Sequence, residues 1–177
     1  MQIKALLKNS ILKNVATLVS GTAIAQLILI GFQLILRRLY EPEVFGAFAV
    51  YMSITGILII LSTLRYELAV VLPEEERKAN SIVVGGITIS LTINTIILIA
   101  IIIFKNYIAD IFGFPAKFSF WLYFVPLSTF LFSSYQMLNY WLTRKGAFVS
   151  IATNKVFRRG FEGLTQSGFG ALSANVG

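Results

Sequence analysis

The chain has 177 residues, of which 56% are hydrophobic and only 13% are charged. A soluble domain has about 25% charged residues, so this chain lacks the polar surface needed to cover a globule in water. It contains neither cysteine nor histidine, which excludes disulfides, cysteine nucleophiles, histidine bases and most zinc or iron sites. We therefore expect a membrane protein that holds no cofactor.

The net charge is +7, from 15 Lys and Arg against 8 Asp and Glu. The cationic residues lie between long uncharged stretches or at their ends. This distribution is typical of membrane topology signals rather than of a nucleic-acid-binding face, so we expect no nucleic-acid partner.

Four stretches are long and apolar enough to cross a bilayer, since about 20 helical residues span about 30 Å of hydrocarbon. The expected spans are residues 14–37, 43–65, 80–104 and 118–143. Pro126 is expected to kink the fourth span. The sequence thus predicts an all-α, polytopic integral membrane helix bundle with four full transmembrane helices and a partial fifth.

The partial fifth helix is expected over residues 160–177. Gly163, Ser167 and Ala171 repeat there every four residues, which predicts a small-residue face suited to close helix packing. A glycine-rich disordered tail is the alternative. Because the helix would stop short, we expect the chain to be the N-terminal portion of a longer transporter bundle.

The cationic residues also predict the orientation of the spans. When residues 144–159 are counted as a loop, eleven Lys and Arg lie on one side of the membrane and four on the other. The positive-inside rule then places the N-terminus in the cytoplasm.

Three of the expected spans carry a polar face. The residues are Thr22, Gln26 and Gln33 in the first span, Gly86, Ser90 and Asn94 in the third, and Thr129, Ser133, Gln136 and Tyr140 in the fourth. Polar side chains avoid lipid, so these faces either form hydrogen bonds between helices or line a hydrophilic cavity. The amides of Gln26 and Gln33 favour a cavity, while both alternatives stay open for the fourth span.

Two charged junctions carry a resemblance to a known family. Residues 38–46 read R-x-Y-x-P-E-x-F-G, and residues 64–73 read LRYELAVVLP. With the preceding LVSGTAIAQLILIGFQLIL, they resemble the N-terminal region of bacterial polysaccharide biosynthesis membrane proteins. These are the oligosaccharide or O-antigen flippases of the multidrug/oligosaccharidyl-lipid/polysaccharide exporter superfamily. The likeness covers about residues 8–145.

This resemblance implies a multi-pass protein of the bacterial inner membrane that is not an enzyme. Its substrate would be an undecaprenyl-pyrophosphate-linked oligosaccharide, moved from the inner to the outer leaflet during surface polysaccharide or O-antigen synthesis. Its partners would be this lipid-linked oligosaccharide, membrane lipids and, as a further candidate, the polysaccharide polymerase machinery. A drug/cation antiporter of the same superfamily and a non-transporting helical scaffold are the alternatives.

Arg65 and Glu67 follow the second expected span and have two interpretations. In the first, the helix runs one or two turns beyond the membrane, Arg65 reaches lipid phosphates and Glu67 points to water, on different helix faces. In the second, Arg65 binds the substrate's pyrophosphate at the cytoplasmic mouth of a cavity, because its planar fork suits phosphate oxygens. Glu67 would then pair with a base or couple transport to a proton or cation.

Arg37 and Arg38 lie at the opposite end of the bundle, where positive charge is expected to be scarce. Glu41 lies three residues after Arg38 and can offset its charge. Membrane anchoring is the simpler role for the two arginines, and release of product at the outer leaflet is the functional alternative. We therefore include Arg37 and Arg38, with Gln26 and Gln33, among the candidate substrate-binding residues.

Overall fold

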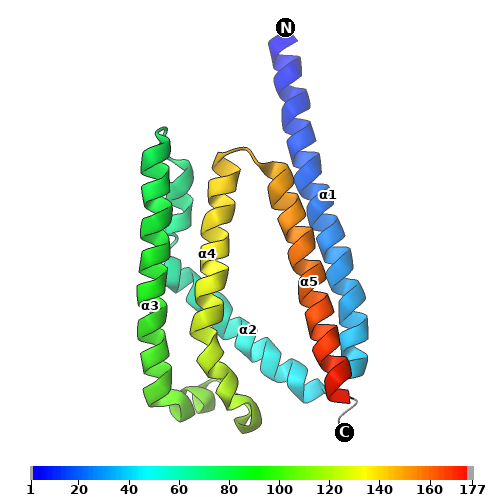
Figure 1. Ribbon diagram of the computed structural model, residues 1–177, viewed down its shortest axis with the longest axis vertical. Helices are drawn as coiled ribbons and strands as arrows, with labels where there is room; N and C mark the ends of the chain where they lie inside the picture. Colours follow the sequence, from blue (N-terminus) through cyan, green and yellow to red (C-terminus); the bar gives the residue numbers. More distant parts are fainter. Residues whose placement is uncertain (1, 175–177) are drawn as a thin grey trace. The chain divides into compact units, whose positions relative to one another are not determined.

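A computed structural model describes the backbone of residues 2–174 and the side chains of residues 12–167 (Figure 1). Its elements are α1 (Gln2–Leu39), α2 (Pro42–Thr63), η1 (Tyr66–Val71), α3 (Glu76–Ile111), η2 (Ala116–Phe124), α4 (Val125–Arg144) and α5 (Phe148–Ala174). Of these described elements, α1 from Leu12 onward, α2 and α3 are long and apolar enough to cross a membrane. The predicted all-α, polytopic membrane fold is confirmed.

The chain divides into two compact units, one of residues 1–42 and 145–177 and one of residues 43–144. In the first unit, α1 packs along α5. Gly21 lies against Ala152, and Gly163 lies against the ring of Phe32, each at a position with no room for a Cβ atom. Gly21 precedes Phe32 along α1, and their partners Ala152 and Gly163 follow the same order along α5, so the two helices run parallel (Figure 1).

In the second unit, α3 and α4 run antiparallel. Gly86 of α3 lies against Met137 of α4, and four residues further along α3, Ser90 bonds Ser133. The short 3₁₀ helix η1 packs against both helices, with Val70 buried between Val83 and Met137. Small side chains on α3 thus let α4 and η1 approach closely.

A second core of the same unit joins α2, α3 and η2. It contains Ala47, Ile54, Ile101, Ala109, Phe114, Phe118, Leu122 and Val125. Aromatic residues dominate η2, where Phe118 and Trp121 have ring centroids 4.9 Å apart. The Nζ atoms of Lys105 and Lys117 each lie 5.5 Å from an aromatic ring centre, as is typical of a membrane–water interface.

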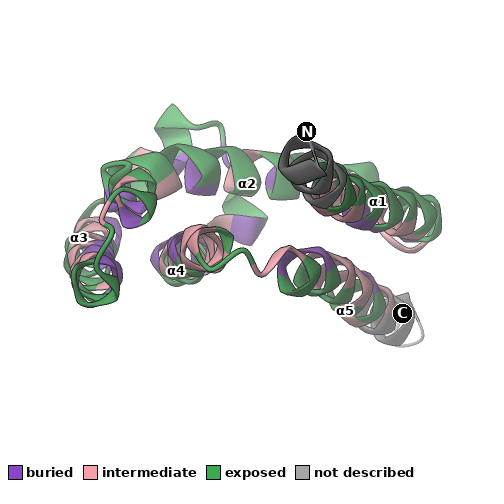
Figure 2. Ribbon diagram, turned by 90° about the horizontal axis from the view of Figure 1, so that it is seen from above, coloured by how far each residue is buried: buried purple, intermediate pink, exposed green. Residues whose placement is uncertain are grey.

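The outer faces of the helices remain apolar and exposed (Figure 2). Leu27 and Leu34 of α1, Ile57 of α2, and Ile96 and Ile103 of α3 are among these exposed residues. A chain that leaves such side chains exposed along whole helices needs lipid as its solvent.

Several boundaries differ from those expected. The helix of α3 is interrupted at Phe104, where the third span was predicted to end, and then continues to Ile111. The fourth expected span begins as the 3₁₀ helix η2, and Pro126 lies in the first turn of α4 instead of kinking its middle. Proline is tolerated there because first-turn N–H groups have no intrahelical acceptor.

The largest difference is at the fifth helix, since α5 begins at Phe148 and not at residue 160. The cationic segment assigned to a loop is therefore helical. Gly163 of the predicted small-residue face is buried against α1, and Ser167 is half-buried. The Ala171 side chain and residues 175–177 lie outside the described part of the chain.

Candidate functional site

The end of α2 is shaped by two consecutive residues in the left-handed conformation. Leu64 has φ 49° and Arg65 has φ 59°, although neither is glycine. The hydroxyl of Thr63 accepts the Arg65 N–H at 3.3 Å, and the Arg65 carbonyl accepts the Leu68 N–H at 3.1 Å. The chain therefore leaves the α2 axis at Arg65, so the expectation that this helix runs on is wrong.

This turn carries Glu67 into the protein, where its side chain is 1% exposed. Its Oε1 atom accepts a hydrogen bond from Gln136 Nε2 at 3.3 Å and lies 3.8 Å from Arg65 Nη1. Among the described residues, Oε2 is buried without a hydrogen-bond partner. The expectations that Glu67 points to water and that the two residues lie on different helix faces are both wrong, because the left-handed turn replaces the helix.

The loop after η1 is held by the last residue of α4. Arg144 donates through Nη2 to the carbonyl oxygens of Pro73, at 2.6 Å, and Glu74, at 2.8 Å. One turn earlier, Trp141 Nε1 donates to Asn80 Oδ1 at 2.8 Å. These bonds fix η1 between α3 and α4, and so fix Glu67 beside Gln136.

The polar stripes of α3 and α4 face each other. The Ser90 and Ser133 hydroxyls lie 2.6 Å apart, and Asn94 Nδ2 donates to the Ser90 carbonyl at 2.8 Å. Thr129 is fully buried, but its hydroxyl has no hydrogen-bond partner among the described residues. The Ser90–Ser133 bond supports hydrogen bonding between these two helices. Gln136 is the exception, since its partner is the Glu67 carboxylate.

The polar stripe of α1 is only partly covered. Thr22 Oγ1 accepts a hydrogen bond from Lys155 Nζ of α5 at 3.2 Å. Gln26 and Gln33 are exposed, and Arg37 and Arg38 are exposed in the last turn of α1. These four residues belong to the first unit, whereas Arg65 and Glu67 belong to the second.

A charged cluster on α5 was missed in the sequence. Arg159 Nη1 lies 2.9 Å from Glu162 Oε2, and Arg158 Nε lies 3.6 Å from Glu162 Oε1. With Lys155, these residues lie at helical spacing alongside the stretch of α1 between Thr22 and Phe32. They belong to a helix that packs along α1, so the expectation of a loop over this segment is wrong. Their three- and four-residue spacing is the signal that could have revealed the helix.

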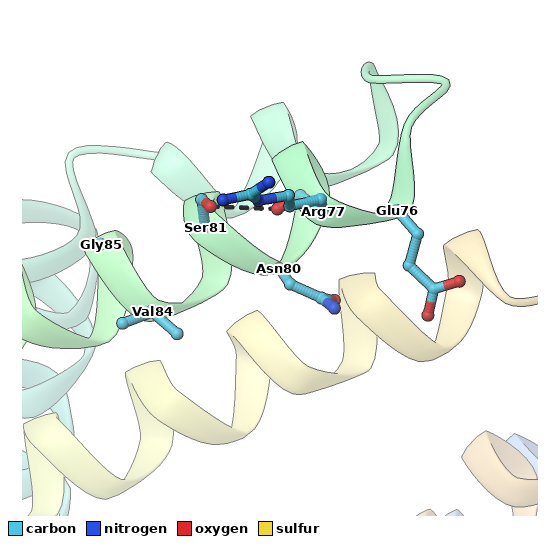
Figure 3. Close-up of a pocket in the computed structure, with 6 residues that line it drawn as sticks. All are labelled: Glu76, Arg77, Asn80, Ser81, Val84 and Gly85. Atoms are coloured by element: carbon cyan, nitrogen blue, oxygen red, sulfur yellow. Dashed lines mark hydrogen bonds between the residues drawn. The ribbon is translucent and has the colours of Figure 1, made fainter.

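An open groove of about 710 Å³ lies along the first turns of α3 (Figure 3). It is lined by Glu76, Arg77, Asn80, Ser81, Val84 and Gly85. Because Glu76 and Arg77 carry opposite charges, the groove has no net charge that would favour binding of an anion or a cation. We therefore consider two separate candidate sites, the buried Glu67 cluster of the second unit and the α5 cluster of the first unit.

A comparison with protein families gives one match. The model of a family described as polysaccharide biosynthesis protein matches residues 11–159. The matched region covers α1 from residue 11 onward and α2 to α4, and it ends within α5 at Arg159. No curated protein and no solved structure matches the chain.

Proposed function

Because the chain belongs to the polysaccharide biosynthesis protein family, we propose that it moves an undecaprenyl-pyrophosphate-linked oligosaccharide from the inner to the outer leaflet of a bacterial inner membrane. The observation that carries this proposal is the family match on a chain whose helices can cross a membrane. A multi-pass membrane protein in polysaccharide biosynthesis suits the export step, where a polar glycan must cross hydrocarbon.

The turn at the end of α2 supports a role for Arg65 in capturing the substrate. Its side chain is 54% exposed, whereas the carboxylate that accompanies it is buried. An exposed guanidinium fixed by a rigid backbone turn can donate two parallel hydrogen bonds to a phosphate. Arg37, Arg38, Gln26 and Gln33 are proposed to contact the substrate along α1, all from exposed positions.

Glu67 supports the proposed coupling of transport to a cation. A carboxylate that is 1% exposed, with an oxygen left without a partner among the described residues, can exchange a bound proton or cation. The same feature favours the second candidate function, a drug/cation antiporter, because that mechanism needs a buried acid inside the bundle.

The parallel packing of α1 and α5 supports four spans before α5. Two helices that cross a membrane in the same direction are separated by an odd number of crossings. Helices α2 and α3 supply two, and α4 would supply the third. We therefore propose that α4 also crosses, although its mixed polar face gives it a weaker apolar signal than the other helices.

The function is tested by the fate of the lipid-linked precursor in the bacterium that carries the gene. We expect deletion to reduce surface polysaccharide and to raise the cellular pool of polyprenyl-pyrophosphate-linked oligosaccharide, measured by mass spectrometry of lipid extracts. Loss of a synthetic enzyme would lower that pool instead. Loss of an antiporter or a scaffold would leave it unchanged, and either result would contradict the proposal.

Substitution of Arg65 tests the proposed site in the same assay. Losing charge-assisted bonds worth about 1.5–3 kcal/mol should weaken substrate capture about 10- to 100-fold, so Arg65→Ala should reproduce most of the deletion phenotype. Arg77→Ala is the matched control, because Arg77 is an exposed arginine at the start of α3. Equal export by the two variants, at equal protein levels, would remove Arg65 from the site.

A further inference from the structure

We propose that η2 lies in the headgroup layer of the membrane and binds the phosphates of phospholipids through a lysine at each end. The surface consists of Lys117, Phe120 and Tyr123 on η2 together with Lys105 of α3, and we call it the η2 ridge. The inference goes beyond the flippase function and rests only on the proposed crossing of α4. The family description assigns no role to these residues.

The ridge follows from the three-residue repeat of a 3₁₀ helix. Side chains three positions apart eclipse one another in such a helix, so Lys117, Phe120 and Tyr123 share one edge of η2. All three are exposed, with Phe120 at 53% and Tyr123 at 39%. Phe118 and Leu122 are instead buried in the core that η2 shares with α2 and α3. The protein thus holds η2 from one side and leaves the ridge uncovered.

A lysine lies at each end of the ridge. The Nζ atom of Lys117 lies 5.5 Å from the centre of the Phe118 ring. Lys105 follows the break in α3 at Phe104, and its Nζ atom lies 5.5 Å from the centre of the Tyr123 ring. An aromatic face attracts an ammonium group, which keeps N–H groups that can donate to phosphate oxygens. Neither lysine forms an ion pair with a carboxylate of the described residues, so both can bind an anion.

The length of α4 places η2 at the boundary of the hydrocarbon. Helix α4 has 20 residues, and its length of about 30 Å matches the hydrocarbon thickness. The expected fourth span, residues 118–143, would be about 39 Å long as a single helix, which is too long for an upright crossing. If α4 fills the hydrocarbon by itself, η2 must lie at its edge. Hydropathy joined η2 to the span because Trp and Tyr have apolar rings and yet favour the interface.

The ring packing of η2 suits the boundary between headgroups and acyl chains. Phe120 packs edge-on against Trp121 and Phe124, with ring centroids 6.3 Å and 6.4 Å apart. These contacts hold an exposed apolar ring beside the ammonium group of Lys117. Bulk water does not suit the ring and hydrocarbon does not suit the charge, whereas the interface accommodates both.

A layer of phospholipids fits the ridge better than a soluble anion does. Six residues of 3₁₀ helix separate Lys117 from Tyr123, on which Lys105 lies, and they extend about 12 Å. One phosphate cannot bridge that distance, but the phosphates of neighbouring lipids can bind both lysines together. Asp110 is exposed on the same segment, so residues 104–124 have a net charge of +1, which favours anionic lipids.

The depth of η2 is measured with a nitroxide spin label on a single cysteine, since the chain has no cysteine of its own. Phe120→Cys labels the ridge, and Leu131→Cys is the matched control on α4, with a similar exposure of 57%. In vesicles of phosphatidylethanolamine and phosphatidylglycerol, collisions with oxygen and with a water-soluble nickel complex report the depth of each label. We expect the Phe120 label at the phosphate level and the Leu131 label about 9 Å deeper, since it lies six residues into α4.

Two results would contradict the anchoring of η2. A label at Phe120 that lies as deep as a deep Leu131 label would show that η2 belongs to the span. A label at Phe120 that meets only the nickel complex, as in bulk water, would show that η2 does not touch the membrane. If both labels lie at the phosphate level, the anchoring stands and the crossing of α4 fails. None of these measurements reports transport, so failure of the flippase proposal is seen only in the precursor pool.

The lysines are tested by native mass spectrometry of the whole chain with phosphatidylglycerol, compared with zwitterionic phosphatidylcholine. Lys105→Gln and Lys117→Gln should each lower the preference for phosphatidylglycerol about fivefold, and Lys117→Arg should retain it. Lys78→Gln is the matched control, because Lys78 pairs with Glu75 at the other end of α3. We expect that control to change nothing.

An unchanged lipid preference in both glutamine variants, or an equal loss in Lys78→Gln, would overturn phosphate binding by the ridge. Inorganic phosphate is the soluble competitor and should not displace the lipid, and displacement at millimolar concentration would indicate a site for soluble anions instead. Circular dichroism verifies that each variant is folded. Because the three lysines are at least partly exposed, we expect all of these variants to fold.

Discussion

Glu67 is buried because of the backbone two residues before it. In a continuing helix, Arg65 and Glu67 would diverge by about 200°, and the carboxylate would face away from α4. The left-handed Leu64 and Arg65 turn the chain off the α2 axis instead, and Glu67 lies beside Gln136. Left-handed residues other than glycine cost about 1–2 kcal/mol each, so the packing of η1 between α3 and α4 must offset that cost.

This arrangement predicts a strong dependence on Gln136. Its amide donates a hydrogen bond to the buried carboxylate, with Nε2 at 3.3 Å from Glu67 Oε1. Gln136→Leu should lower the free energy of unfolding by about 1–3 kcal/mol, because a charged acceptor loses its partner. The fluorescence of Trp121 and Trp141, which both lie in the same unit as Gln136, reports this unfolding in detergent.

The matched control is Gln166→Leu, because that side chain is exposed and only its backbone carbonyl accepts a bond from Tyr40. A double-mutant cycle with Glu67→Leu isolates the contact, and the double variant should be more stable than the sum of the single effects predicts. Additive effects would show that Glu67 and Gln136 do not interact.

The sequence indicated that Arg65 and Glu67 were unusual but not how they meet. Charged residues at the end of an apolar stretch can be recognised in the sequence. A left-handed pair of non-glycine residues is not, since Leu64 and Arg65 have no local preference for that conformation. Tertiary packing of η1 selects it, so the buried carboxylate could be found only in three dimensions.

At the scale of helices, α1 packs against α5 through glycines that have no room for a Cβ atom. Gly163 meets the ring of Phe32, whereas Gly160, three residues earlier on α5, has no such neighbour. The two glycines therefore share the same loss of helix propensity but differ in packing. This difference makes them a matched pair for testing the α1–α5 interface.

Gly163→Leu should weaken the interface by about 1–3 kcal/mol, because overpacking forces the helices apart. Amide hydrogen exchange of α5 in detergent should accelerate by about tenfold or more. Gly160→Leu should not accelerate it, since leucine favours a helix more than glycine does. Adding Phe32→Ala to Gly163→Leu should restore protection. Equal exchange in the two single variants would show that Gly163 is not an interface residue.

Hydrophobicity and small-residue spacing predicted the helices, but the prediction was wrong where a helix contains charged residues. The sequences of α1, α2 and α3 are apolar enough for these helices to be recognised without a structure. The start of α5 was missed because Lys155, Arg158 and Arg159 suggested a loop. Those cations have partners in Thr22 and Glu162. Thr22 becomes visible as a partner only when α1 lies alongside, whereas the spacing of Glu162 from the two arginines was present in the sequence.

At the scale of the whole molecule, the threading follows from charge and from the parallel pair. Without the α5 cluster, the Lys and Arg count is still eight on the N-terminal side against four on the other. The cytoplasmic N-terminus therefore remains the prediction. Because α1 and α5 run parallel, the start of α5 must lie on the same side as the start of α1 if both helices cross.

Single cysteines test this threading, because the chain has no cysteine of its own. Glu41→Cys and Ala116→Cys should react with a membrane-impermeant maleimide in intact spheroplasts. Glu74→Cys and Ser150→Cys should react only after permeabilisation. All four positions are exposed, so a difference in labelling reports the side of the membrane rather than burial.

If Ser150→Cys is labelled in intact spheroplasts together with Ala116→Cys, then α4 does not cross the membrane, and α1 and α5 cannot both be spans. If all four patterns are inverted, the chain threads in the opposite direction, and Arg65 then faces the outer leaflet, where it could not capture a substrate made inside the cell.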